Sequence, residues 1–346
     1  MTYKMKIFLG SLFTFLILWI VGPFTGIDDY TASVKEKTAE SPVFQEIGKV
    51  ATAEPEQEKT EPLPGRKEWI DRIRLEAVKL RIEPINAKLD RIWKAIPGYN
   101  GLEVDEAKTL ELIKKTAKLS DPISFVYKEI QPQINLQDLA ISPIYKGNPH
   151  KPMVSLMINV AWGNEFLPMM LEILKKESVH ATFFFDGSWL SKNIETAKLI
   201  GTQGHELSNH AFSHKNMSKL SRQAAMDEIV KTEQLLVKEL GVHNTLFAPP
   251  SGDFKQETVE IAHELQLQTI LWTLDTVDWS NPTPESILQK ISTKLEPGSL
   301  ILMHPTRSSS LALEAMIKEI KRKGLLLGTV SELLSTNRVP GIHSLP

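Results

Sequence analysis

Two histidines four residues apart, His210 and His214, are the first residues of this chain whose type and spacing suggest chemistry. Histidines at positions i and i+4 of a helical turn face the same way, and two imidazoles on one side can bind one divalent metal ion. The chain has nine histidines, so a pair at this spacing is a weak signal by itself. Its position directly after a predicted strand favours a metal site over a pair that only packs or caps.

A third histidine, His304, follows a run of four apolar residues. An imidazole at a strand end that faces a cleft suits general acid catalysis. Such a histidine needs a carboxylate to orient it, and Asp275 or Asp278, after the preceding predicted strand, could supply one. Trp162 and Trp279 lie at strand ends as well, where each could form an apolar wall against a sugar or an acyl methyl group, or simply pack in the core.

These residues must be positioned by a regular series of elements that begins at residue 153. Short apolar segments alternate with amphipathic helical ones, which predicts a parallel sheet with crossover helices. Seven strands in one stretch favour a closed or nearly closed barrel, whose chemistry lies at the C-terminal strand ends. The predicted strands are 153–160, 181–186, 205–209, 245–249, 268–274, 299–304 and 325–330, and predicted helices include 221–240, 255–264, 284–294 and 308–322.

The N-terminal region differs from the rest. An uncharged, apolar segment at 7–21 follows Lys4 and Lys6, which is typical of a signal peptide or a membrane anchor. We favour an uncleaved anchor, because no Ala-x-Ala cleavage site follows. Lysines on the N-terminal side predict that the body of the protein lies outside the cytoplasm, membrane-anchored or secreted.

The fold class that we expect is therefore α/β: a distorted (β/α)7-type barrel preceded by a small α/β domain and an N-terminal apolar anchor. The segment before the small domain is rich in Glu, Pro and Thr and lacks aromatic residues over 51–65, which predicts disorder. The expected parts are a signal-anchor or signal peptide at 1–26, a disordered linker at 27–65, the small domain at 66–145, the barrel at 150–336 and a tail at 337–346.

Composition excludes several classes of site. The chain has no cysteine, which rules out disulfides, zinc–thiolate sites and cysteine nucleophiles. A net charge of −2 and the lack of a nucleic-acid-binding fingerprint give no reason to expect a nucleic-acid partner.

In this order, the five strand-end segments resemble the five motifs of the NodB-homology polysaccharide deacetylases, carbohydrate esterase family 4. The resemblance runs from Met153 to Leu334 and is strongest to sporulation-associated deacetylase-like proteins of Gram-positive bacilli, which share the variant first motif INVAWGNE. Family members remove acetyl groups from N-acetylated sugars of chitin or peptidoglycan with a divalent metal that activates water. The resemblance thus implies a divalent metal, expected to be zinc, an N-acetylated cell-wall glycan as partner, and a location facing the cell wall.

The resemblance also implies roles for single residues. His210 and His214 match the metal ligands, and His304 matches the general acid. Of the two candidate carboxylates, Asp275 is the expected partner that orients His304. The expected substrate contacts are Trp279, Trp162 and Pro249.

The first motif departs from the family pattern Thr-Phe-Asp-Asp-Gly, in which the first Asp is the base and the second binds metal. Here Asn159 and Val160 stand at these positions. An amide cannot accept a proton as a carboxylate does, and valine has no ligand atom. Asn164 and Glu165 follow shortly after and are the candidates to substitute, with Asn164 as the candidate metal ligand.

The third motif departs too, because the Arg of Arg-x-Pro-Tyr-Gly is Ala248 here. In the family this Arg pairs with the catalytic Asp, and an Arg beside a neutral Asn would be a costly unpaired charge. Three hypotheses follow. The protein is a metal-dependent deacetylase of cell-wall amino sugars with altered chemistry, a catalytically inactive relative that binds glycan or acts as a wall or sporulation scaffold, or a different hydrolase on the same scaffold.

Overall fold

The computed structural model describes residues 65–116 and 122–339. The predicted anchor at 1–26, the predicted linker apart from Gly65, and most of the predicted tail lie outside the described residues. No helix within the described ranges is long and apolar enough to cross a membrane. The boundaries of the five predicted parts stay predictions.

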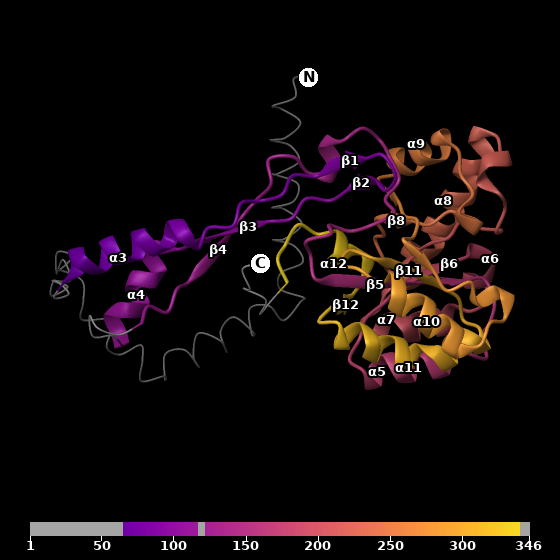
Figure 1. The fold of residues 1–346 in the computed structure, drawn as a ribbon. Coiled ribbons are helices and arrows are strands. Elements are labelled where there is room, and N and C mark those ends of the chain that lie inside the picture. The colour runs from indigo at the N-terminus through magenta and orange to yellow at the C-terminus, as the bar shows by residue number, and fades with distance from the viewer. Residues whose placement is uncertain (1–64, 117–121, 340–346) are drawn as a thin grey trace, which may run out of the picture. The chain divides into compact units, whose positions relative to one another are not determined.

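One parallel sheet positions the strand-end residues, and Figure 1 shows it surrounded by helices. Its hydrogen-bonded order is β10, β11, β5, β6, β7, β8, β9, with β12 also paired to β5. Strands β10 and β9 lie at the two ends of this order, so the sheet is open. It curls into a half-barrel. The expected α/β fold with a distorted barrel is confirmed at this level. The strands are β5 (Met153–Val160), β6 (Thr182–Phe185), β7 (Glu206–Asn209), β8 (Leu246–Phe247), β9 (Gln268–Thr269), β10 (Leu274–Asp275), β11 (Leu300–Met303) and β12 (Leu326–Gly328).

The prediction of one continuous strand at 268–274 was wrong, because this segment forms two separate strands, β9 and β10. After β9 the backbone changes partner: the nitrogen of Leu271 donates to the carbonyl of Ile144 at 2.8 Å, and that of Thr273 donates to Leu300 at 2.9 Å. Ile144 comes from far upstream in the sequence, so the apolar pattern of the segment carried no sign of this change.

Helices follow most strands, and several of them begin with a side-chain cap. The Ser221 side chain accepts a hydrogen bond at the start of α8, and Gly241 ends that helix in left-handed backbone. Helices α5, α10 and α11 lie together on one side of the sheet (Figure 1). The helices are α5 (Leu167–Lys176), α6 (Gly187–Leu190), α7 (Ile194–Thr202), α8 (Arg222–Leu240), α9 (Gln256–Glu264), α10 (Pro284–Lys294), α11 (Arg307–Arg322) and α12 (Val330–Leu334), with 3-10 turns η3 (Leu136–Asp138), η4 (Met217–Lys219), η5 (Pro250–Gly252) and η6 (Asp278–Ser280).

Strand β5 is buried along its whole length, and its side chains alternate between two hydrophobic clusters. Ile158 and Val160 belong to the outer cluster, between the sheet and its helices. Met157 belongs to the inner cluster, within the curl of the sheet. Asn159 has the same parity as Met157, so the alternation places its side chain inside the curl, at the C-terminal end of the strand.

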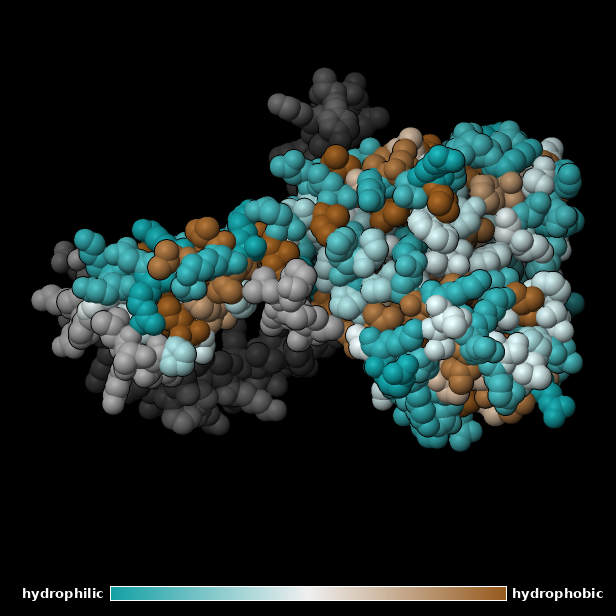
Figure 2. Space-filling model, in the orientation of Figure 1, coloured by the Kyte–Doolittle hydropathy of each residue, from teal (hydrophilic) through white to brown (hydrophobic). Residues whose placement is uncertain are grey.

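The segment that precedes the sheet forms two helices and two small antiparallel sheets. Its hydrogen bonds to the rest include Asn148 Nδ2 to the carbonyl of Pro97, at 2.9 Å. Leu75 and Val78 of α3 expose most of their side chains, and Figure 2 shows apolar patches among polar ones over this part. The elements are α3 (Arg66–Lys79), β1 (Lys88–Asp90), β2 (Lys94–Ile96), β3 (Gly101–Val104), α4 (Glu106–Thr116) and β4 (Tyr127–Ile130).

Candidate active site

A pocket of about 380 Å³ opens at the C-terminal ends of the parallel strands. It brings together most of the residues that the sequence singled out, from four separate predicted motifs. Pro249, Asn164 and His210 are not among its lining residues. The pocket is lined by Asn159, Trp162, His214, Ser251, Trp272, Asp275, Trp279, Leu302 and His304.

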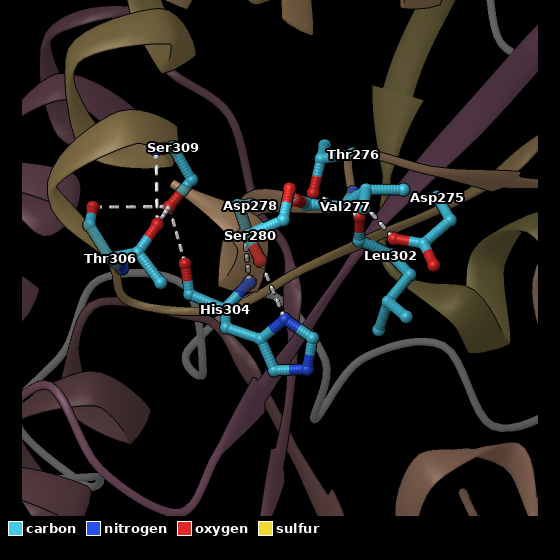
Figure 3. A network of polar contacts seen from close by, with 9 residues as sticks. All are labelled: Asp275, Thr276, Val277, Asp278, Ser280, Leu302, His304, Thr306 and Ser309. Carbon is cyan, nitrogen blue, oxygen red and sulfur yellow. Dashed lines mark hydrogen bonds and ion pairs between the residues drawn. The ribbon is translucent and has the colours of Figure 1, made fainter. Parts of the chain in front are cut away.

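His304 is held by Asp278, and the prediction that Asp275 orients it was wrong. Oδ1 of Asp278 lies 2.8 Å from Nδ1 of His304, and Oδ2 accepts a hydrogen bond from the His304 backbone nitrogen at 2.6 Å. The Asp275 carboxylate instead accepts from the nitrogen of Val277 at 2.7 Å. Figure 3 shows the two carboxylates apart, with only Asp278 bonded to the imidazole.

The backbone explains why the second aspartate reaches His304. Val277 adopts left-handed backbone with φ 56°, which a β-branched residue rarely does. The turn that results places Asp278 at the start of η6, where it is buried beneath the end of β11. The hydroxyl of Ser309 donates to the carbonyl of His304 (Figure 3), so both backbone and ring of this histidine are fixed.

His210 and His214 meet as predicted, with ring centroids 5.3 Å apart. They lie on a loop and not on the predicted helical turn, because Ala211 and His214 both adopt left-handed backbone. Nδ1 of His210 lies 2.7 Å from the carbonyl of Ala248. A carbonyl only accepts, so Nδ1 carries the proton and Nε2 keeps its lone pair. Burial, followed by the neighbouring His214, lowers the pKa of His210 to about 3.

The loop that carries the histidine pair is fixed by Glu228 of α8, a residue that the sequence analysis did not single out. Its carboxylate accepts from the nitrogen of Ser213 at 2.7 Å and from the Ser213 hydroxyl at 2.7 Å, and it pairs with Lys215 at 3.2 Å. Burial would raise the pKa of Glu228, but these hydrogen bonds outweigh burial and hold the pKa below its usual range. No local pattern marks this position in a helix.

The donor set at this end of the pocket does not fit a three-ligand zinc centre. No group of three His, Cys, Asp or Glu side chains within 65–116 and 122–339 is placed to hold a metal ion. Val160, at the family's ligand position, is fully buried in the outer cluster. Structural and catalytic zinc sites normally have three or four protein ligands.

Asn164 does not supply the missing ligand, contrary to the prediction. Its Oδ1 accepts from Nε1 of Trp189 at 2.5 Å, and its Nδ2 donates to Asn193 at 2.7 Å. Both ends of the amide are therefore used away from the histidine pair.

Asn159 stands at the position of the family base and faces the pocket. Its side chain is only 3% exposed, and its Oδ1, which is buried, has no hydrogen-bond partner among the residues that the structure describes. A buried amide oxygen without a partner costs free energy. A neutral amide also cannot remove a proton from water.

Aromatic rings form much of the remaining wall. The ring of Trp162 stacks on His304, with centroids 5.3 Å apart and planes 12° apart. Trp279 is 64% exposed at the pocket rim. Two further lining residues, Trp272 and Ser251, were not selected from the sequence: Trp272 lay inside the predicted strand 268–274, and Ser251 lay in the altered third motif. Pro249 is buried just before η5.

Comparison with known proteins identifies the family. The polysaccharide deacetylase model matches residues 146–270. The chain is 44% identical over 263 residues to the uncharacterized protein YlxY of Bacillus subtilis, which covers 76% of this chain and 82% of YlxY. It is also 31% identical over 199 residues to the peptidoglycan-N-acetylglucosamine deacetylase of Bacillus cereus, covering 56% of this chain and 72% of that enzyme. This chain belongs to the polysaccharide deacetylase family.

Solved structures of family members include relatives with altered sites. BA3943 of Bacillus anthracis, described as a pseudoenzyme of carbohydrate esterase family 4, is 44% identical, with a TM-score of 0.72 over 78% of this chain and 96% of that chain. A BA3943 mutant with restored enzymatic activity is 43% identical, with the same TM-score, over 78% of this chain and 99% of that chain. The expected family is thus confirmed, and its structural relatives support an altered active site in this polysaccharide deacetylase family member.

Proposed function

We propose that this protein binds N-acetylated cell-wall glycan in the strand-end pocket and does not hydrolyse it at an appreciable rate. The observation that carries the proposal is Asn159, which puts a neutral amide with an unpartnered oxygen where a deacetylase of this family has its base. The pocket has an aromatic lining and several polar groups. Its relatives include both peptidoglycan deacetylases and a family pseudoenzyme.

The chemistry of deacetylation explains why these changes matter. Amide hydrolysis needs a group that takes the proton from the attacking water, and losing such a group typically lowers the rate by ~10²–10⁴-fold. Within the part of the chain that the structure describes, no third His, Cys, Asp or Glu side chain joins His210 and His214 to complete a zinc centre. Binding needs neither group, because shape, stacking and hydrogen bonds suffice for it.

A weak hydrolase is the second candidate, and the pair formed by His304 and Asp278 supports it. This pair is fully built, with Nδ1 of His304 fixed at 2.8 Å from the carboxylate. Asp275 is the carboxylate among the residues that line the pocket, and so it is the candidate base. Glu165, the other candidate from the sequence, is exposed and does not line the pocket.

We further propose that the protein acts outside the cytoplasm, held at the membrane through residues 1–26 and facing the cell wall. The lysine-flanked apolar segment supports this location, and so does a glycan ligand that belongs to the wall.

Calorimetric titration with N-acetylated chito-oligosaccharides and muropeptides tests the function, with released acetate measured in the same samples. We expect saturable binding and no acetate above the blank. The de-N-acetylated oligosaccharides serve as the matched ligand control. Acetate release by the wild type that disappears in His304→Ala would favour the weak hydrolase, and the lack of any glycan binding would overturn the proposed function.

A further inference from the structure

The hairpin formed by β1 and β2, Lys88–Ile96, presents apolar and basic side chains together. Leu89 is 49% exposed, and Ile92, in the turn between the two strands, is 69% exposed. Three basic residues are interspersed with them and are exposed as well, Lys88, Arg91 and Lys94. Single exposed apolar side chains are common on protein surfaces, but two of them among three basic residues of one hairpin mark a candidate interaction surface.

The turn of the hairpin has a fixed shape. Oδ1 of Asp90 accepts hydrogen bonds from the nitrogens of Ile92 and Trp93, at 2.7 and 2.8 Å, and these bonds close the turn. Strand β2 is covered on its other side, because the nitrogen of Ala95 donates to the carbonyl of Pro143 at 3.1 Å. The turn and β1 are therefore the outer part of the hairpin.

The basic side chains of the hairpin are available to a partner. In the neighbouring segment, Lys146 is neutralised by its ion pair with Glu296. By contrast, Lys88, Arg91 and Lys94 form no ion pair with any residue in the part of the chain that the structure describes, and Lys94 donates only to a backbone carbonyl. The hairpin therefore carries a local positive excess, although the whole chain has a net charge of −2.

The segment beside the hairpin adds two more exposed apolar side chains. Ile134, whose carbonyl accepts from the nitrogen of Ala87 at 2.8 Å, is 40% exposed, and Ile141 is 39% exposed. Aliphatic side chains next to unpaired basic ones suit the interface of an anionic lipid bilayer, where both kinds of side chain find partners. A dissolved polyanion would satisfy the basic side chains and leave the aliphatic ones in water.

We propose that the hairpin docks on an anionic phospholipid bilayer, with Leu89 and Ile92 in the headgroup region and the three basic side chains against lipid phosphates. This inference rests on the proposed location, in which residues 1–26 hold the chain at the same bilayer. A tether raises the local concentration of the hairpin at the membrane surface, so a weak affinity of its own suffices for docking.

The full chain in lipid vesicles tests the contact. It has no cysteine, so Ile92→Cys gives a single attachment site for an environment-sensitive fluorophore such as nitrobenzoxadiazole. Val237→Cys, at a position of α8 that is 45% exposed, is the matched control. The vesicles are phosphatidylcholine alone or an equal mixture with phosphatidylglycerol. We expect blue-shifted, stronger emission at position 92 in the anionic vesicles only, and no difference between the two vesicles at position 237.

Removal of charge measures the strength of the contact. Each basic side chain near an anionic membrane strengthens binding about five-fold, so replacing all three in the hairpin by Gln should lower the docking equilibrium constant by roughly 100-fold. High salt should act in the same direction, because it screens the attraction. The matched control removes the same charge elsewhere, at three exposed lysines, and should change nothing. These control substitutions are Lys175→Gln, Lys238→Gln and Lys294→Gln.

Flotation of the unlabelled full chain with the same vesicles separates this inference from the proposed location. Flotation with neutral vesicles supports the anchor, and equal emission at position 92 in neutral and anionic vesicles then overturns the docking alone. If the chain floats only with anionic vesicles and the hairpin variant abolishes this, the anchor fails and the docking stands. Flotation with neither vesicle overturns both. The same change of emission on adding soluble poly(glycerol phosphate) in neutral vesicles would overturn the bilayer as the partner.

Discussion

The carboxylate of Asp278 accepts hydrogen bonds from two atoms of His304, the ring Nδ1 at 2.8 Å and the backbone nitrogen at 2.6 Å. This double contact fixes both the rotamer and the tautomer of the imidazole, with the proton on Nδ1. The histidine at the position of the family's general acid is therefore firmly held, in a chain whose residue at the position of the family base is an amide.

Replacing Asp278 should be far more disruptive than replacing Asp275. Asp278→Ala leaves two buried donors of His304 unsatisfied, and we expect the free energy of unfolding to fall by ~2–4 kcal/mol. Asp275→Ala, at a partly exposed position, should cost less than about 1 kcal/mol. Urea denaturation of both variants checks the ranking. Equal losses would contradict the assignment of Asp278 as the partner of His304.

Glu228 should act as an anchor for the loop that carries His214. Glu228→Ala removes the acceptor of the Ser213 nitrogen and hydroxyl, and we expect a loss of ~2–3 kcal/mol in the free energy of unfolding. The neighbouring Asp227 is exposed, so Asp227→Ala is the matched control and should change stability little. Denaturant unfolding measures both. A Glu228→Ala variant as stable as its control would show that the loop does not depend on this carboxylate.

Gly163 should tolerate no side chain. Gly163→Ala combines left-handed backbone with a Cβ that would lie 1.9 Å from Pro305, so we expect it to cost about 3 kcal/mol. Gly324 has a similar φ of +74° but open space around its Cα, and Gly324→Ala should cost only about 1 kcal/mol. Thermal unfolding of the two variants separates backbone strain from the clash. Similar losses of stability in the two variants would mean that the loop carrying Trp162 shifts readily to make room for the added Cβ.

Stability should fall in mild acid because of buried neutral histidines. The pKa of His210 is lowered from 6.5 to about 3, mainly by burial, and that of His205 is lowered to about 4 for the same reason. The unfolded chain therefore binds more protons than the folded chain below pH 6.5. The stabilisation is fully present above pH 6.5 and is lost progressively toward pH 3 to 4, by up to ~1.4 kcal/mol per pH unit for each histidine.

The pH dependence of the melting temperature between pH 7 and pH 4 measures this loss. His210→Gln removes one titrating group, and so it should flatten the curve relative to wild type. The variant His243→Gln, at an exposed position, is the control and should leave the slope unchanged. A wild-type slope that His210→Gln does not alter would place the acid sensitivity elsewhere.

Much of the fold follows from local patterns in the sequence. The strand predicted at 153–160 is β5, because a short, mostly apolar segment in an alternation of strands and helices is typical of a buried parallel strand. The helix predicted at 284–294 is α10, which Thr283 caps and Pro284 begins. The predicted strands likewise placed His214, His304 and Asn159 at strand ends, where the structure brings them into one pocket.

The choices that failed depend on contacts between distant segments or on unusual backbone. The sequence gives no reason to choose between Asp275 and Asp278 as the partner of His304. The left-handed turn at Val277 determines which of the two reaches it. Strand 268–274 divides because Ile144 pairs with its middle. The side chain of Asn164 is hydrogen-bonded to Trp189 and Asn193, and no spacing rule predicts these contacts.

Zinc content after loading is the most direct test of whether the pocket has lost its metal chemistry. The full-length protein is saturated with zinc, dialysed and subjected to elemental analysis, with His210→Ala as the control. Because no third ligand joins His210 and His214 among the described residues, we predict far less than one zinc ion per chain and no difference between wild type and control. One tightly held zinc ion per chain that is lost in His210→Ala would contradict the account and return the protein to the metal-dependent hydrolases.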